Sequence, residues 1–539
     1  MPRMPSKLRP TPDLSKRNDS TRLLQKAISF HKVGDLAQAA RGYQQILSLT
    51  SKHFDATHLL AVVNAQLGQV DKSRDLFTRA LALRPNHAEA HFNKGTMEKA
   101  AGELVAAVID FGFTLENAPD HLGALNNRSL VLLELQRFEE ALSDNERLLK
   151  LTPEDAVAHN NRGTILHKMM RLDQSLTSFD KAIRLKPDYV EAFNNRGNLL
   201  KDLHRFDEAI ADYNSAIAID SDFAAAPFNK SITMLLKGDL EQGWRLWEWR
   251  WQQTKLTSPK RDFEAPLWID NSDIDGKTIL LHSEQGFGDT IQFIRYAPMV
   301  ADLGARIVVE APASLHPLLS SVCGVDQLVD KGEALPSFDY HCPLMSLPMA
   351  FGTTLKTVPA EVPYLTVSRA RADYWSARLG SSLKPRVAFA WRGNPNNSND
   401  RNRSAKLVDL RQHLSPDIDW LCLHHDLDTL ESETAKSINH LMTPLDADTD
   451  LEDATAICAL ADVIVTVDTS FAHVAGALGK TSFVMLPFTP DWRWMMGRHD
   501  SPWYPTMTLF RQDGSHDWRL VMQDVATALQ NYLIFNLKE

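Results

Sequence analysis

Side chains of fixed type recur every 34 residues along the first half of the chain, which is the period of a repeated helical unit. Each unit has a turn residue, a small side chain five residues later, and in six of seven units an aromatic side chain four residues after that. The turn positions are Gly34, Gly68, Gly102, Gln136, Met170, His204 and Gly238. This spacing predicts two helices per unit that approach closely at the small residues.

Proline ends four successive units, at Pro85, Pro119, Pro153 and Pro187, as expected where a helix must stop. The pattern resembles the tetratricopeptide (TPR) repeat. It predicts an all-α TPR superhelix of about seven repeats over residues 21–252. The preceding segment, 1–20, is rich in Pro, Lys, Arg and Ser and is expected to be a disordered tail.

A column of asparagines runs through the repeats, two residues before a small position of each first helix. Its members are Asn93, Asn127, Asn161, Asn195 and Asn229. Two residues are about 200° around a helix, so these amides are expected to face the groove of the superhelix. An amide can both donate to and accept from a peptide backbone. The column resembles the peptide-binding asparagine ladder of O-GlcNAc transferase and predicts a protein or peptide acceptor. The alternative is that Asn is a common polar residue at this position.

The last repeat departs from the pattern, with four tryptophans between residues 244 and 251. Such a cluster can stack on carbohydrate, but a repeat array also needs a cap and a junction to the domain that follows. The junction is the favoured interpretation.

Beyond residue 252 the period ends, and a linker over 253–276 leads to short β-rich runs that alternate with helical stretches. This alternation predicts parallel sheets with crossover helices. We expect two Rossmann-like halves that face a cleft, at 277–370 and 371–539. The predicted strands are 278–282, 306–310, 339–342, 386–391, 420–423, 463–467, 482–486 and 508–510.

Each half contains one segment suited to ligand binding. In the first half, Gly286 and Gly288 allow the backbone to approach a ligand, and Asp289 stands at the start of a helix predicted over 290–303. Asp289 is either a functional carboxylate or only a helix cap.

In the second half, the strand at 463–467 leads into Asp468, Thr469 and Ser470, which place a helix N-terminus where a pyrophosphate binds well. His473 falls one turn into that helix, on the side of Ser470. It is interpreted as a catalytic residue of the site, with a packed core histidine as the alternative.

Residues 276–511 resemble the family 9 glycosyltransferases, the heptosyltransferase-like group with a GT-B fold. They resemble more closely a set of bacterial proteins that fuse TPR repeats to such a domain. The matching segments are 281–295, 391–394, 400–404, 467–479, 490–494 and 501–505.

The resemblance implies an inverting, metal-independent transfer from a nucleotide sugar, with no other cofactor. By the same resemblance Asp289 is the candidate general base, and Arg401 or Arg403 lies near the donor phosphates. Arg392 also falls in a matching segment and is assigned to the donor site. Asp468, Thr469 and His473 map onto the stretch whose helix end stabilises the departing nucleotide diphosphate.

The repeats favour a protein acceptor over the lipopolysaccharide of true heptosyltransferases. Some bacterial fusions of this type are associated with flagellin glycosylation, so flagellin is one expected acceptor. The nucleotide and the sugar stay open. Two other functions also stay open: a TPR adaptor with a degenerate transferase domain, and a binding protein that senses a sugar or nucleotide.

Composition narrows the choice of partners. A formal net charge of -10 and a pI near 6.0 argue against a nucleic-acid partner. The four cysteines form no CxxC pair and show no metal-ligand spacing. No stretch approaches the ~20 apolar residues of a membrane span. We therefore expect a cytoplasmic protein without a metal site.

Overall fold

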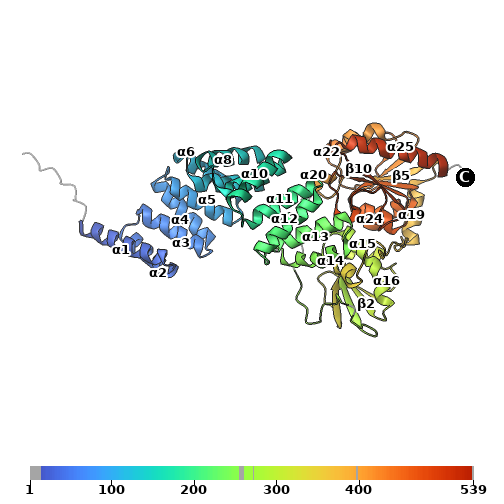
Figure 1. Cartoon of the computed structure of the whole chain (residues 1–539), viewed down its shortest axis with the longest axis horizontal. Coiled ribbons are helices and arrows are strands. Elements are labelled where there is room, and N and C mark those ends of the chain that lie inside the picture. Colours follow the sequence, from blue (N-terminus) through green and yellow to red (C-terminus); the bar gives the residue numbers. More distant parts are fainter. Residues whose placement is uncertain (1–13, 254–259, 271, 396–398, 537–539) are drawn as a thin grey trace, which may run out of the picture. The chain divides into compact units, whose positions relative to one another are not determined.

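The computed structural model describes residues 14–253, 260–270, 272–395 and 399–536. The chain forms two compact units, Met1–Leu199 and Leu200–Glu539. In Figure 1 the first unit consists of paired helices, and the second contains the last helix pairs together with two parallel sheets. The all-α repeats followed by parallel α/β halves confirm the predicted fold class.

Fourteen helices form the repeats, two per unit as predicted. They are α1 (Leu14–Lys32), α2 (Leu36–Leu49), α3 (Phe54–Gln66), α4 (Val70–Leu83), α5 (Ala88–Ala100), α6 (Leu104–Asn117), α7 (Leu122–Glu134), α8 (Phe138–Leu151), α9 (Ala156–Lys168), α10 (Leu172–Leu185), α11 (Val190–Asp202), α12 (Phe206–Ile219), α13 (Ala225–Lys237) and α14 (Leu240–Trp247).

The expected disordered tail is wrong for residues 14–20, because α1 begins at Leu14. No proline or glycine occurs between Asp13 and Gly34, so nothing in the sequence stops the helix from extending towards the N-terminus. The remainder of that prediction, residues 1–13, lies outside the described residues.

The seven predicted turn positions all have left-handed backbone. Four are glycines, such as Gly102 with φ +82°, but Gln136, Met170 and His204 adopt φ of 59–60° with a side chain present. A non-glycine residue in this region costs roughly 1–2 kcal/mol. The 34-residue period therefore marks positions where the backbone must be left-handed, whether or not the residue is glycine.

Close helix contact explains the small residues. A Cβ added at Gly163 would lie 2.6 Å from the ring of Phe179, and one at Gly95 would lie 2.9 Å from Phe111. Where the small residue is Ser175, its hydroxyl donates to the backbone carbonyl of Gly163 at 2.7 Å. The predicted close approach of the two helices at the small residues is confirmed, and the aromatic side chain of the second helix lies against them.

The first α/β half holds a four-stranded parallel sheet with strand order β3-β2-β1-β4. Its strands are β1 (Thr278–His282), β2 (Arg306–Ala311), β3 (Gln327–Asp330) and β4 (Tyr340–Pro343). The sequence predicted β1, β2 and β4 to within one residue. It missed β3, whose four residues carry too few apolar side chains to stand out.

The helix predicted over 290–303 is interrupted. The structure has α15 (Phe287–Phe293), a 3₁₀ turn η2 (Ile294–Tyr296) and α16 (Ala297–Ala301) in its place. Pro298 lies in the first turn of α16 and has no N–H to continue a helix from upstream, which accounts for the break.

The second half holds a six-stranded parallel sheet with order β10-β9-β8-β5-β6-β7. Its strands are β5 (Arg386–Ala390), β6 (Asp419–Cys422), β7 (Leu441–Met442), β8 (Val463–Val467), β9 (Ser482–Leu486) and β10 (Met507–Arg511), and only the two-residue β7 was not predicted. Its helices include α19 (Arg369–Leu379), α23 (Leu451–Leu460), α24 (Ser470–Ala477) and α25 (Trp518–Asn536). The predicted boundary near residue 370 falls at the start of α19.

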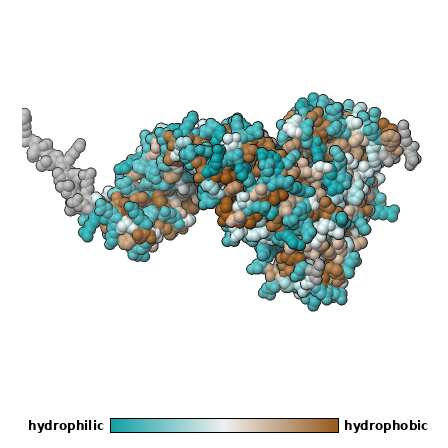
Figure 2. Space-filling model, viewed as in Figure 1, coloured by the Kyte–Doolittle hydropathy of each residue, from teal (hydrophilic) through white to brown (hydrophobic). Residues whose placement is uncertain are grey.

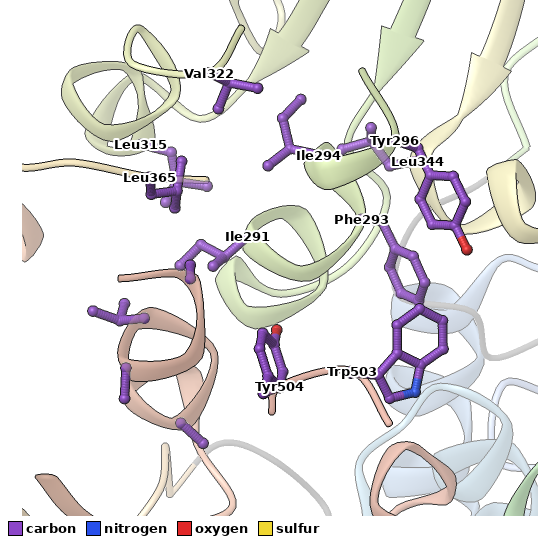
Figure 3. Packing of buried hydrophobic residues seen from close by; sticks show 14 of the residues in the cluster. Ile291, Phe293, Ile294, Tyr296, Leu315, Val322, Leu344, Leu365, Trp503 and Tyr504 are labelled. Carbon is purple, nitrogen blue, oxygen red and sulfur yellow. The ribbon is translucent and has the colours of Figure 1, made fainter. Parts of the chain in front are cut away.

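The last repeat is packed into the core of the α/β unit. Trp244 and Trp247 are buried, and both contact Trp492 edge-on, with ring centroids 5.1 and 5.5 Å apart. The same apolar cluster continues to Phe293, the last residue of α15, and to Trp503, and both are labelled in Figure 3. The junction interpretation of the tryptophan cluster is confirmed.

The molecular surface mixes hydrophilic and hydrophobic residues (Figure 2). One helix of the first unit, α6, exposes the apolar side chains of Val105, Ile109 and Phe113 at four-residue spacing. In the described part of the chain, no helix is both long and apolar enough to cross a membrane.

Candidate active site

A cavity of about 1070 Å³ lies between the two α/β halves, at the carboxyl edges of both sheets. Loops that follow parallel strands meet at this edge, which is where open α/β sheets bind ligands. The predicted site residues that line it are Gly286, Gly288, Asp289, Arg392, Arg403, Asp468, Thr469, Ser470 and His473. The sequence thus identified residues from both sides of one cavity.

The turn after β1 is shaped by two glycines. Gly286 N–H donates to Asp289 Oδ2 at 2.8 Å, which caps α15. A Cβ on Gly288 would lie 2.6 Å from Cδ2 of His473, so only glycine fits where α15 approaches α24. The two predicted ligand-binding segments are therefore in direct contact.

The two carboxylate oxygens of Asp289 have different partners, one typical of a helix cap and one typical of a buried charged site. Its Oδ2 caps the helix, and its Oδ1 is ion-paired with Arg493. Burial raises the pKa of Asp289 above its ordinary value, although the Arg493 charge opposes the shift. The carboxylate is thus a stronger base than an exposed aspartate and is also held in place by a cation.

Arg493 is a cavity residue that the sequence analysis did not assign. Its guanidinium donates to Asp491 Oδ1 and Gln292 Oε1, both at 2.8 Å, and lies 4.1 Å from the ring centre of Trp492. The signal was present in the segment 490–494, where a cation stands between two tryptophans that point into the core. A buried arginine needs carboxylate partners, and Asp491 lies two residues away.

The loop that carries Arg493 also contacts the repeats. The ring of His204, at the turn between α11 and α12, stacks on Phe488 with centroids 4.0 Å apart. Thr489 Oγ1 lies 3.3 Å from His204 Nε2. Downstream, Met496 N–H donates to the carbonyl of Leu236 at 3.1 Å. The cavity-lining loop 488–496 is therefore fixed by residues of the last two repeats.

The start of α24 has the predicted geometry. Asp468 directly follows β8, and Thr469 Oγ1 accepts the N–H of Phe471 at 3.2 Å as the helix cap. Burial raises the pKa of Asp468 to about 6, and the neighbouring Asp491 charge acts in the same direction. The cavity therefore contains a carboxyl group that is a weaker acid than an ordinary aspartate.

His473 is buried within the same helix. Its Nδ1 lies 2.9 Å from the hydroxyl of Tyr504, and its ring stacks on Trp494 at 5.5 Å. Burial, helped by the charges of Arg493 and Arg295, holds the pKa of His473 well below its ordinary value. The imidazole is neutral at physiological pH.

The arginines of the first loop of the second half are not equivalent. Arg403 lines the cavity, whereas Arg401 is exposed and is not among the lining residues. Arg392 also lines it but donates to Glu431 and Asp426, both at 2.9 Å. Of the two arginines proposed for the donor phosphates, Arg403 is the one at the cavity.

The asparagine column lies on the first helix of each repeat, with four members in the first unit and Asn229 on α13. Asn161 Nδ2 donates to Asn126 Oδ1, and Asn195 Nδ2 donates to Asn160 Oδ1, each at 3.1 Å. Each bond joins successive repeats at a spacing of 35 residues. These two column residues therefore already use one amide hydrogen within the array.

Within the described residues, no group of three or more His, Cys, Asp or Glu side chains is arranged to hold a metal ion. All four cysteines are free; Cys323 is exposed, and the other three are buried.

Family models match both parts of the chain. Tetratricopeptide repeat models match residues 24–88, 66–112, 156–189 and 190–223. The model of Glycosyltransferase family 9 (heptosyltransferase) matches residues 419–524. That second match includes Asp468, His473 and Arg493 but ends short of the turn at Asp289.

Among curated proteins, the chain is similar to Protein FlbA of Caulobacter vibrioides, with 25% identity over 96% of this chain and 91% of FlbA. Among solved structures, it is similar to a tetratricopeptide repeat protein from Parabacteroides merdae, with 18% identity and a TM-score of 0.38, covering 43% of this chain and 91% of that one. It is also similar to the TPR protein YrrB, with 20% identity and a TM-score of 0.32, covering 35% and 97%.

Proposed function

Because this chain combines TPR repeats with a glycosyltransferase family 9 domain, we propose that it transfers a sugar from a nucleotide-sugar donor to a protein held by the repeats. The observation that carries the proposal is the cavity in which the Asp289 turn of one half faces the α24 N-terminus of the other. Glycosyl transfer needs a base on one side and a fixed positive potential on the other.

The donor is proposed to lie on the second half, with its diphosphate at the N-terminus of α24. Exposed backbone N–H groups and the helix dipole favour an anion there, and Arg403 adds a positive charge. These groups would stabilise the leaving diphosphate, so the proposed reaction is independent of a metal ion. The neutral His473 would contribute packing and hydrogen bonding, since it carries no charge.

The acceptor is proposed to approach from the first half. Its hydroxyl oxygen attacks the anomeric carbon on the face opposite the diphosphate, the bond to the phosphate oxygen breaks, and the configuration inverts. Asp289 takes the hydroxyl proton, which its raised pKa favours. Proton uptake weakens the ion pair with Arg493, and Arg493 keeps Asp491 as its second carboxylate partner.

A protein acceptor is supported by the TPR array, and the asparagine column is the proposed peptide contact. Flagellin is one candidate acceptor. The proposed site of action is the cytoplasm, which agrees with four cysteines that form no disulfide.

Donor hydrolysis and transfer test the proposal. Purified protein is incubated with UDP-, ADP-, GDP- and CMP-linked sugars, and released nucleotide is measured with and without host protein extract. We expect one donor class to be hydrolysed. Asp289→Asn should keep the affinity for that donor, measured by calorimetry, and lower turnover by about 10²–10⁴-fold.

Thr469→Trp provides the complementary variant, since a bulky side chain at the α24 cap should weaken nucleotide binding while the fold survives. A TPR adaptor with a degenerate transferase domain is the second candidate, and the engagement of both Asp289 oxygens is the observation that favours it. Absence of nucleotide binding in the wild-type protein, with intact binding of partner proteins, would establish the adaptor and overturn the enzyme.

A further inference from the structure

Charged side chains on the first-half wall of the cavity are neutralised by ion pairs, with one exception. Glu284 accepts two hydrogen bonds from the guanidinium of Arg250, at 2.8 and 2.9 Å, and Asp289 is paired with Arg493. The third charged residue of this wall is Lys331. Across the described ranges of the chain, no carboxylate lies within 4.0 Å of its ammonium group.

The cations of the opposite wall are all compensated. Each arginine there has a carboxylate partner: Arg392 pairs with Glu431 at 2.9 Å, Arg403 with Asp400 at 3.5 Å, and Arg493 with Asp491 at 2.8 Å. Lys331 is thus the one cavity-lining lysine or arginine, among the residues the structure describes, that lacks such a partner.

Lys331 lies at the carboxyl edge of the first sheet, which borders the cavity. It directly follows β3, and its backbone N–H donates to the carbonyl of Ala311, the last residue of β2, at 3.0 Å. Glu310, which precedes Ala311, is occupied by Arg261 and by the N–H of Gly332. The Lys331 ammonium therefore extends from a fixed backbone without internal neutralisation.

Two further first-half residues line the cavity with Lys331. Ser314 lies in the turn η3 (Ala313–Leu315) after β2, and Phe287 begins α15 with 39% of its surface exposed. An exposed aromatic ring, a hydroxyl and an uncompensated lysine suit a polar ligand that brings apolar contact and one negative charge.

We propose that Lys331, with Ser314 and Phe287, forms an acceptor subsite that selects a hydroxyl group flanked by an acidic side chain. The inference rests on the proposed function, which places the acceptor on the first half beside Asp289. It specifies the substrate class: a serine or threonine with an aspartate or glutamate nearby in the sequence. The flexible ammonium group recognises the charge rather than the shape of that neighbour.

The donor diphosphate is another source of negative charge within the same cavity. The two sources differ in which step depends on Lys331. An acceptor contact changes the preference among acceptors, whereas a phosphate contact changes the affinity for the nucleotide and leaves the preference among acceptors alone. The experiment separates these outcomes.

Synthetic peptides with a single Thr flanked by Asp, Asn or Lys serve as acceptor probes. The donor in these assays is the nucleotide sugar that the protein hydrolyses among the UDP-, ADP-, GDP- and CMP-linked sugars. The readout is the ratio of kcat/KM between Asp- and Asn-flanked peptides on one preparation, which cancels changes in the donor step. We expect the wild-type protein to favour the Asp-flanked peptide about three- to fivefold, as a solvent-exposed ion pair allows. Lys331→Gln should abolish the preference, and Lys331→Glu should shift it to the Lys-flanked peptide.

Binding of the same peptides, labelled with a fluorophore and followed by anisotropy, gives a readout that does not require turnover. Lys277→Gln is the matched control, because Lys277 is an exposed lysine at the opposite end of β1. A charge preference that survives Lys331→Glu in both assays would overturn the proposal. So would a loss of nucleotide affinity in Lys331→Gln with the peptide preference intact, which would assign Lys331 to the donor. If none of the nucleotide sugars is hydrolysed but the protein still binds the peptides according to their charge, the proposed reaction is overturned and the proposed subsite is not.

Discussion

The guanidinium of Arg493 is paired with the carboxylate of Asp289, and this pair joins the loop after β9 to the turn after β1 across the cavity. The two residues are 204 positions apart in the sequence. The side chain of Arg493 is only 9% exposed, so its charge depends on Asp289 and Asp491 for compensation. The candidate base is thus part of the ion-pair network that holds the two halves together.

Removal of the Arg493 charge should be more damaging than removal of the Asp289 charge. Arg493→Met leaves two partly buried carboxylates, Asp289 and Asp491, without their shared cation and should cost about 1–3 kcal/mol of unfolding free energy. Asp289→Asn leaves Arg493 with Asp491 and should cost less. Urea unfolding followed by tryptophan fluorescence measures both, because all 12 tryptophans lie between residues 244 and 518 in the second unit.

The double variant tests the pairing itself. If the two residues interact as described, Arg493→Met should cost less in the Asp289→Asn background than in the wild type, with a coupling energy of about 0.5–3 kcal/mol. Additive effects would show that the pair contributes nothing to stability.

Asp468 should make the stability of the second unit depend on pH. Its pKa is raised to about 6 in the folded protein, so the ionised carboxylate is unfavourable in the fold. As the pH falls from about 7 to 4, the folded protein takes up a proton that the unfolded chain does not yet hold, and this group's contribution becomes more favourable. Asp468→Asn should therefore be more stable than the wild type above pH 6 and lose that advantage near pH 4. Unfolding of both proteins across this range measures the difference, and a constant gap would contradict the assignment.

Two residues with the same strained turn geometry separate backbone strain from loop positioning. Met170 and His204 both have φ of +59°, but the ring of His204 also stacks on Phe488. Met170→Gly should relieve the strain, stabilise the first unit by about 0.5–1 kcal/mol, and leave turnover unchanged.

His204→Gly relieves the same strain but removes the stack and the contact with Thr489. We expect lower turnover, because the loop that carries Asp491 and Arg493 loses its support. Far-UV circular dichroism checks that the helices of both variants are intact, and donor hydrolysis reports the loop. Equal turnover in both variants would show that the contact is packing alone.

The asparagine column should affect acceptor use without affecting donor hydrolysis. One change should be nearly silent, since an exposed hydrogen bond contributes about 0.5–1.5 kcal/mol, but several should add. The variant replaces Asn127, Asn161, Asn195 and Asn229 with Ala. We expect impaired modification of a protein acceptor and intact hydrolysis of the nucleotide sugar, measured on the same preparation.

The inter-repeat bonds supply a matched control for that variant. The double variant Asn126→Ala and Asn160→Ala removes the side-chain oxygens that accept these two hydrogen bonds. It leaves the column residues themselves in place. Both variants should be somewhat less stable, but only the column variant should lose acceptor modification. An equal loss in both would mean that the column serves the shape of the array.

Local periodicity explains what was predictable. The turn positions at Gln136, Met170 and His204 followed from spacing alone, and the structure adds that each has left-handed backbone, whatever residue occupies it. Strands β8 and β9 were predicted to the residue, since each is a continuously buried run in which four of the five residues are apolar.

Contacts between distant segments explain what was not predictable. Arg493 and Asp289 lie on loops that follow strands of different sheets, and no local pattern encodes their contact. The same holds for Lys331, which is notable because no carboxylate among the described residues forms an ion pair with it. Residues were found by sequence where one segment builds the feature, and missed where two segments build it.

Trp244 and Trp247 are buried against Trp492, so the two ends of the repeat array should differ in how freely they can gain or lose whole repeats during evolution. A solenoid can ordinarily change its length by gain or loss of whole repeats, because each repeat contacts only its neighbours. Here the final repeat shares its core with the α/β unit, so a duplication or deletion that displaced it would expose that core. Because His204, between α11 and α12, also contacts Phe488, variation in array length among relatives is expected upstream of α11, while the segment from α11 to Arg250 is inherited with the α/β unit.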